Sequence, residues 1–102
     1  MFENLAAMAS AIKQAKEIKN NVKRIREDMA NSSFEGFAND NKTKATVSGD
    51  LRVISIAISP DAGSAAGELA AAAVNAAMDN AKSTLQQRIR EAAGGLDLPD
   101  LF

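Results

Sequence analysis

The chain contains neither histidine nor cysteine among its 102 residues. This absence removes Ser-His-Asp and Cys-His arrangements for nucleophilic catalysis, together with the common zinc sites. The carboxylates are scattered, and their one adjacent pair, Glu27 and Asp28, lies near the end of a predicted helix. We interpret this pair as a solvated helix end rather than as a general acid and base or a metal site. The residue types therefore predict a protein that is not an enzyme and needs no metal or cofactor.

The side chains that can bind a ligand are basic and are concentrated on the first predicted helix. Four of them share a stripe about 80° wide at 100° per residue, here called the basic stripe: Lys16, Lys19, Lys23 and Arg26. A DNA duplex carries one negative charge per about 1.7 Å of its axis, so a row of cations can neutralise several phosphates. Further candidate contacts are Lys13 and Arg24 on the same helix, Lys82, Arg88 and Arg90 on a second helix, and Lys42, Lys44 and Arg52 between them. The alternative is an ordinary solvated helix face with local pairs such as Lys13–Glu17.

Composition limits which nucleic acid and which compartment to expect. The net charge of −1 argues against a generic nucleic-acid binder, for which the total is basic. No aromatic residue lies near the basic stripe, so base stacking on single strands is not expected. The N-terminus lacks the features of a signal peptide, and the alanine-rich stretch 70–77 is too short to span a membrane. These features predict a cytoplasmic protein with no membrane and no small-molecule substrate as partner.

The basic stripe needs a long helix to carry it, and the sequence predicts one over residues of about 3–29. Apolar residues recur there in steps of three and four, with no Pro or Gly inside. The apolar stripe drifts around the helix, which fits either the core face of one domain or pairing with a helix of another chain. Such a helix is about 40 Å long, whereas a compact domain of this size has a radius of gyration of about 13 Å. Part of the helix must therefore project or lie along another subunit.

Three strands are expected next, over residues of about 33–38, 42–48 and 51–59. Gly49-Asp50 predicts a two-residue type II′ hairpin turn, which pairs Ala45 with Ile54 and Thr43 with Ile56. Because both faces of 51–59 carry apolar residues, we expect this strand to be central and covered on both sides.

A second helix is expected over about 65–93, followed by a tail over 94–102. Ser64 is the expected N-cap, and Gly94-Gly95 is the expected stop. The alanine run from Ala70 to Ala77 allows a sheet or another helix to approach its backbone closely. The predicted fold is therefore a single α+β domain over residues 1–102, ordered α-β-β-β-α, with a three-stranded antiparallel sheet between two long helices.

This order, with these residues, resembles the YbaB/EbfC family of bacterial nucleoid-associated proteins over nearly the whole chain. The hairpin segment Val47–Pro60, the segment Leu69–Met78 and the ending Gly95–Phe102 carry the resemblance, together with Met1-Phe2 before the first helix. The chain departs from the family pattern at Asn39–Thr43, where glycines are common in the family. Its first helix is also richer in alanine.

The resemblance implies an intertwined, tweezer-like homodimer that binds double-stranded DNA in the nucleoid with weak sequence preference, organising the nucleoid or influencing transcription. It implies no catalytic residue. We expect contact mainly through phosphates, by the paired protruding helices. The alternative is a non-catalytic structural or adaptor dimer whose exposed helix ends and tail bind another protein.

Overall fold

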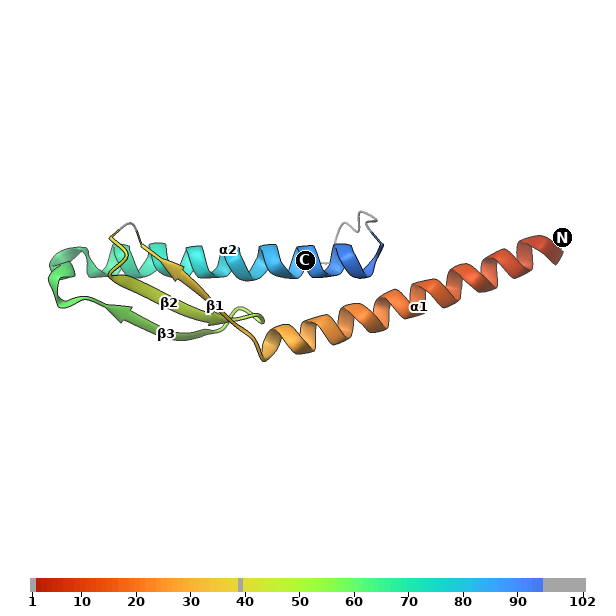
Figure 1. Cartoon of the computed structure of the whole chain (residues 1–102), viewed down its shortest axis with the longest axis horizontal. Coiled ribbons are helices and arrows are strands. Elements are labelled where there is room, and N and C mark those ends of the chain that lie inside the picture. The colour runs from red at the N-terminus through yellow and green to blue at the C-terminus, as the bar shows by residue number, and fades with distance from the viewer. Residues whose placement is uncertain (1, 39, 95–102) are drawn as a thin grey trace.

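The computed structural model describes residues 2–38 and 40–94. Its elements, in order, are α1 (Phe2–Ala30), β1 (Ser33–Phe37), β2 (Thr43–Ser48), β3 (Val53–Ile58), the 3₁₀ helix η1 (Pro60–Ala65) and α2 (Ala66–Ala92). The strands form one antiparallel sheet in the order β1-β2-β3, so the predicted α-β-β-β-α fold is confirmed (Figure 1). The expected tail beyond Gly94 lies outside the described residues, and the homodimer stays a prediction.

The core lies between α2 and the first two strands. Ala73, Ala77 and Ala81 of α2 are fully buried against Ala45 and Val47 of β2. The predicted close approach at the alanine run is therefore found, against the sheet. Contact is closest at Gly36 of β1, where an added Cβ atom would lie 2.1 Å from the backbone nitrogen of Ala77. Only glycine allows α2 to lie this near the strand.

The predicted hairpin turn and register between β2 and β3 are wrong. Gly49 has no positive φ, whereas a type II′ turn requires one at its first central residue; Leu51 has it instead, with φ 65°. The loop is accordingly longer, with the Leu51 N–H donating to the Ser48 carbonyl, and a register shift follows at Thr46/Val47. As a result Ala45 pairs with Ile56 rather than with Ile54, and Thr43 pairs with Ile58 rather than with Ile56.

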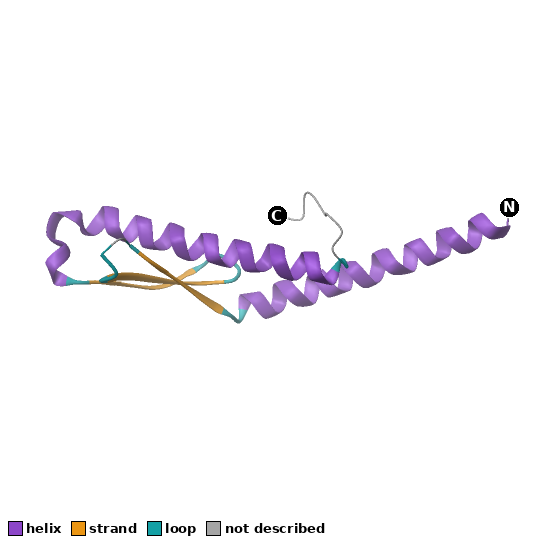
Figure 2. Ribbon diagram, turned by 45° about the horizontal axis from the view of Figure 1, so that its top comes forward, coloured by secondary structure: helices purple, strands orange, loops and turns teal. Residues whose placement is uncertain are grey.

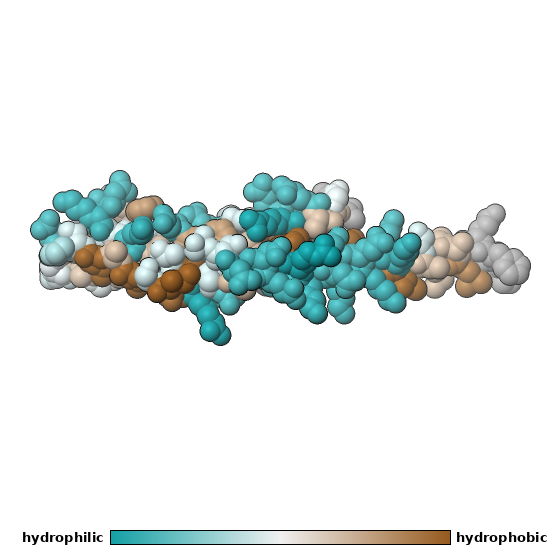
Figure 3. Space-filling view, turned by 60° about the horizontal axis from the view of Figure 1, so that its bottom comes forward, coloured by the Kyte–Doolittle hydropathy of each residue, from teal (hydrophilic) through white to brown (hydrophobic). Residues whose placement is uncertain are grey.

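The predicted central position of the third strand is also wrong for a single chain. β2 is the central strand, and β3 forms an edge whose six residues are all exposed. Ile56 and Ile58 lie opposite Ala45 and Thr43 and so share the face on which α2 lies, but α2 covers mainly β1 and β2. In Figure 3 apolar side chains gather over this end of the molecule. The apolar sequence of β3 is thus uncovered in the single chain.

A proline precedes the second long helix and a glycine follows it, but the N-cap of α2 differs from the prediction. Ser64 lies inside η1, and Ala65 occupies the N-cap position without a side-chain hydrogen bond. The chain already turns at Ser59, whose hydroxyl accepts from the Asp61 N–H just before the helical geometry set by Pro60. At the other end Gly94 adopts φ 69° immediately after the C-cap, as the predicted stop requires.

The first helix projects from the rest of the molecule. The molecule is 72 Å long with a radius of gyration of 19.4 Å, well above the roughly 13 Å of a compact domain of this length. α1 runs antiparallel to α2 and packs beside its C-terminal end, then continues past it alone (Figure 2). Every residue from Asn4 to Glu17 is exposed, so about half of α1 buries no side chain against the rest of the described chain.

Candidate nucleic-acid interface

The basic stripe lies on α1 where the helix emerges from the body of the molecule. All four of its residues are exposed. Lys19, Lys23 and Arg26 line one shallow hollow, and the buried Val22 and the carboxylate of Glu27 line it with them. The structure therefore brings these three cations to one surface, as the helical rotation predicts. From Lys16 to Arg26 the row is about 15 Å long.

Charge is strongly segregated in this part of α1. The span from Lys13 to Arg26 holds six of the chain's twelve Lys and Arg residues but one of its thirteen carboxylates, Glu17. The pair Lys13–Glu17, which belongs to the alternative of a solvated helix face, is not formed, and no lysine of α1 takes part in an ion pair within the described residues. The row of lysines therefore presents its charge to solvent although the chain as a whole is slightly acidic.

Two other candidate cations of α1, Lys13 and Arg24, point elsewhere. Both are exposed, and helical rotation places them about 20° from each other but about 110° from the centre of the basic stripe. They are about 16 Å apart along the helix and do not extend the basic stripe.

The candidate cations of α2 do not form a row. Lys82, Arg88 and Arg90 are exposed, but no two of them lie closer than about 80° around the helix. Arg88 reaches across to α1, where its Nη1 lies 3.4 Å from the sulfur of Met29. Among these three, Arg88 thus has a structural contact between the two helices.

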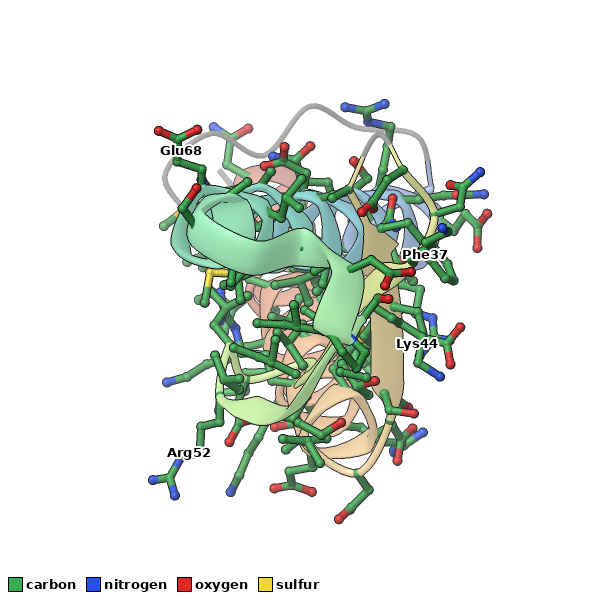
Figure 4. The ribbon with its side chains drawn as sticks, turned by 90° about the vertical axis from the view of Figure 1, so that its left-hand side faces the viewer. Phe37, Lys44, Arg52 and Glu68 are labelled. Atoms are coloured by element: carbon green, nitrogen blue, oxygen red, sulfur yellow. The ribbon has the colours of Figure 1, made fainter. Side chains whose placement is uncertain are left out.

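The cations of the sheet are separated from the stripe and from one another. Lys44 Nζ lies 3.5 Å from Glu35 Oε1, and Arg52 Nε lies 3.8 Å from Asp50 Oδ2. Lys42 pairs with Asp61 at 3.8 Å. Lys44 and Arg52 point in different directions when the molecule is viewed along its long axis (Figure 4). We therefore leave these three residues out of the interface.

The sequence-based prediction lacks one contact that holds the projecting helix α1, here called the arm, to the sheet. This contact is made by Met29 near the end of α1, here called the anchor. The Met29 side chain is 1% exposed, and its carbonyl accepts a 2.9 Å hydrogen bond from the Gly49 N–H of the hairpin loop. A Cβ atom on Gly49 would lie 2.2 Å from the Met29 carbonyl oxygen, so glycine is required there. The signal in the sequence is that Met29 ends the apolar series of the first helix, and Gly49 needs space rather than an unusual φ.

The described residues meet the requirements of neither a metal site nor a membrane-spanning helix. Among the described residues there is no group of three or more His, Cys, Asp or Glu side chains placed to hold a metal ion. Neither helix, over the described part of the chain, is both long and apolar enough to cross a membrane.

The described chain is thus a small α+β protein with an exposed row of cations on its projecting helix. The chain matches the YbaB/EbfC DNA-binding family over residues 4–96 and belongs to that family. It is 34% identical over 98 residues to a nucleoid-associated protein of Cyanothece sp., covering 92% of this chain and 86% of the relative. Nucleoid-associated proteins of Thermoanaerobacter pseudethanolicus and Nostoc sp. are each 31% identical over 96 residues, covering 89% and 90% of this chain and 86% and 84% of the relatives. The resemblance drawn from the sequence is confirmed, and membership in a DNA-binding family agrees with the expectation that the chain is not an enzyme.

Proposed function

We propose that this protein binds double-stranded DNA in the nucleoid mainly through phosphates, with weak sequence preference, and so organises the nucleoid or influences transcription. The observation that carries the proposal is the exposed basic stripe on a helix that projects from the folded body. The relatives' names, as nucleoid-associated proteins, support the same location.

The dimensions of the stripe suit a duplex backbone. Over the roughly 15 Å between Lys16 and Arg26, a duplex presents about nine phosphate charges. Four cations on one helix face can therefore each lie near a phosphate. Lysine supplies three of the four, and its flexible ammonium neutralises charge without the planar, bidentate fork that arginine offers to a base edge. The composition of the stripe thus favours phosphate contact over base reading.

A homodimer is the second part of the proposal. β3 is an edge strand, and Val53, Ile54 and Ile56 expose 47%, 59% and 43% of their surface. An apolar edge of this kind is a site for association in a soluble protein. A second copy of the chain is the partner we propose, which doubles the number of basic stripes available to one DNA molecule.

The function is tested by reversing charge within the stripe. The Lys19→Glu/Lys23→Glu variant should bind two duplexes of unrelated sequence more weakly, on the order of tenfold or more for each, because phosphate contacts dominate affinity. The matched control is Lys42→Glu/Arg52→Glu, which changes the net charge equally on the sheet. Fluorescence anisotropy at one fixed salt concentration measures all three proteins, and circular dichroism verifies that both variants are folded.

The pattern of losses distinguishes the alternatives. Phosphate contact at the basic stripe predicts a large and equal loss on both duplexes for the stripe variant and a smaller loss for the control. Base reading predicts a loss confined to one duplex. Equal affinity of the folded stripe variant and the wild-type protein would reduce the stripe to a solvated face and favour the adaptor function.

A further inference from the structure

The end of the projecting arm carries apolar side chains that nothing in the described chain covers. Leu5, Met8 and Ile12 expose 62%, 60% and 55% of their surface. Their spacing of three and four places them on one face of α1, here called the tip stripe. No charged residue lies between Asn4 and Ile12. In Figure 3 apolar side chains recur along this part of α1, beyond the hydrophilic middle of the helix.

The tip stripe is not a continuation of the face that packs on α2. At 100° per residue, its three residues fall within the sector about 80° wide that contains the basic stripe. Ile18, Val22 and Met29, which face α2, lie about 90° away from it. One exposed face of α1 is therefore apolar over its first turns and basic from Lys16 onward.

The described C-terminal end of the chain does not cover the tip stripe. Ala92 at the end of α2 and the two residues after it, Ala93 and Gly94, line a hollow together with Gln14, Glu17 and Asn21 of α1. These residues of α1 are on its opposite side, roughly 180° from the tip stripe.

DNA is also a poor partner for this end of the helix. The absence of Lys and Arg from residues 4–12 leaves no cation there to neutralise a phosphate. The small residues beside the stripe, Ala9 and Ala11, instead allow another helix to approach closely. The features of the surface fit an uncharged apolar helix better than a polyanion.

We propose that the tip stripe pairs with the tip stripe of a second copy in antiparallel orientation. Leu5 then packs against Ile12 of the other copy, and the two Met8 side chains meet at the centre. Parallel pairing would bring Lys16 and Lys19 of both copies together, which like-charge repulsion opposes. Antiparallel overlap directs the two basic stripes away from each other, so each remains available to a duplex.

The pairing is weak in free protein and is strengthened on DNA. The tip stripe spans one heptad, and a self-sufficient coiled coil needs about three to four. Copies bound to one duplex have a raised effective concentration, so a larger fraction of them forms the weak contact. This inference therefore rests on the proposed function, and it links DNA-bound copies tip to tip.

The absence of cysteine makes single-cysteine variants clean probes of this contact. With oxidised glutathione added as the two-electron oxidant, Met8→Cys should form an intermolecular disulfide on a long duplex with a yield about tenfold above that of Ser10→Cys. Ser10 lies in the same exposed segment but roughly 170° from the tip stripe, so it is the matched control. In a mixture of Leu5→Cys and Ile12→Cys proteins, the mixed disulfide should exceed either self-linked product.

DNA binding of each variant is measured in parallel by anisotropy, which separates two failures. Normal DNA binding with equal yields for Met8→Cys and Ser10→Cys overturns the tip contact and leaves the proposed function standing. Preferential Met8→Cys linkage at high protein concentration without any DNA binding supports the contact and overturns the proposed function. Self-linkage of Leu5→Cys in excess of the mixed product overturns the antiparallel arrangement.

Discussion

The two long helices are nearly equal in length, yet the rest of the chain holds them very differently. α2 has 27 residues and buries four of them, three of which are alanines seated against the sheet. α1 has 29 residues, and from Asn4 onward, where burial is described, it buries two, Val22 and Met29, both in its C-terminal half. Small residues let α2 lie on a strand backbone, whereas the larger apolar residues of α1 touch the body only near its end. α2 therefore acts as the scaffold of the sheet and α1 as an arm anchored at one end.

A substitution that disturbs the packing of α2 on β1 should have the largest effect on stability. Gly36→Ala places a Cβ atom 2.4 Å from the Ala73 carbonyl oxygen, and two backbones cannot yield as a flexible side chain can. We expect a loss of about 3 kcal/mol or more in the free energy of unfolding. The matched control is Gly67→Ala, where the added Cβ meets nothing within 4 Å, and we expect a gain of up to about 1 kcal/mol. Urea denaturation measures both, and equal stabilities would contradict the close seating of α2.

Removing the Met29 contact that holds α1 to the body should lower the free energy of unfolding by less than Gly36→Ala does. Met29→Ala removes a side chain that is 1% exposed and contacts Arg88, so we expect a loss of about 2–4 kcal/mol. The same substitution at Met8, which is 60% exposed, should change the free energy of unfolding by less than about 0.5 kcal/mol. Thermal and urea melts compare the two variants. Similar costs at both positions would show that α1 is supported along its whole length.

A charge on β3 should act on association. Ile56→Asp places a carboxylate on the apolar face proposed to meet a second copy, and an unpaired buried charge is strongly unfavourable. We expect dimer dissociation to increase by about tenfold or more, or about 1.4 kcal/mol. Ser55→Asp adds the same charge to the neighbouring, oppositely directed residue of β3 and should have a smaller effect. Light scattering after gel filtration reads the oligomeric state, and a wild-type protein that is monomeric at micromolar concentration would refute the dimer.

The contrast between the helices also explains what could be predicted from the sequence. The periodicity of α1 and the alanine run of α2 are local patterns, so the element order, the projecting arm and the close packing on the sheet follow from them. Helical rotation likewise predicts which cations of α1 share a face. These properties depend on residues within one helix.

The predictions are wrong where the structure depends on contacts between segments that are distant in the sequence. Gly49 indicates a type II′ turn locally, but its actual requirement is space beside the Met29 carbonyl. The apolar residues of β3 predict a covered central strand. In the single chain, however, β3 is an exposed edge strand. Rotation alone also could not show that Arg88 contacts Met29 while the basic stripe faces solvent.

The most direct test of the central claim is the salt dependence of DNA affinity. The slope of log K against log salt reports the number of phosphates neutralised, at about 0.9 per contact on a duplex. For wild-type protein and the folded Lys19→Glu/Lys23→Glu variant, titrations over a range of salt concentrations give the two slopes. If a dimer engages both arms, the variant loses four contacts and its slope is shallower by about 3.6. An unchanged slope would contradict phosphate binding by the arm.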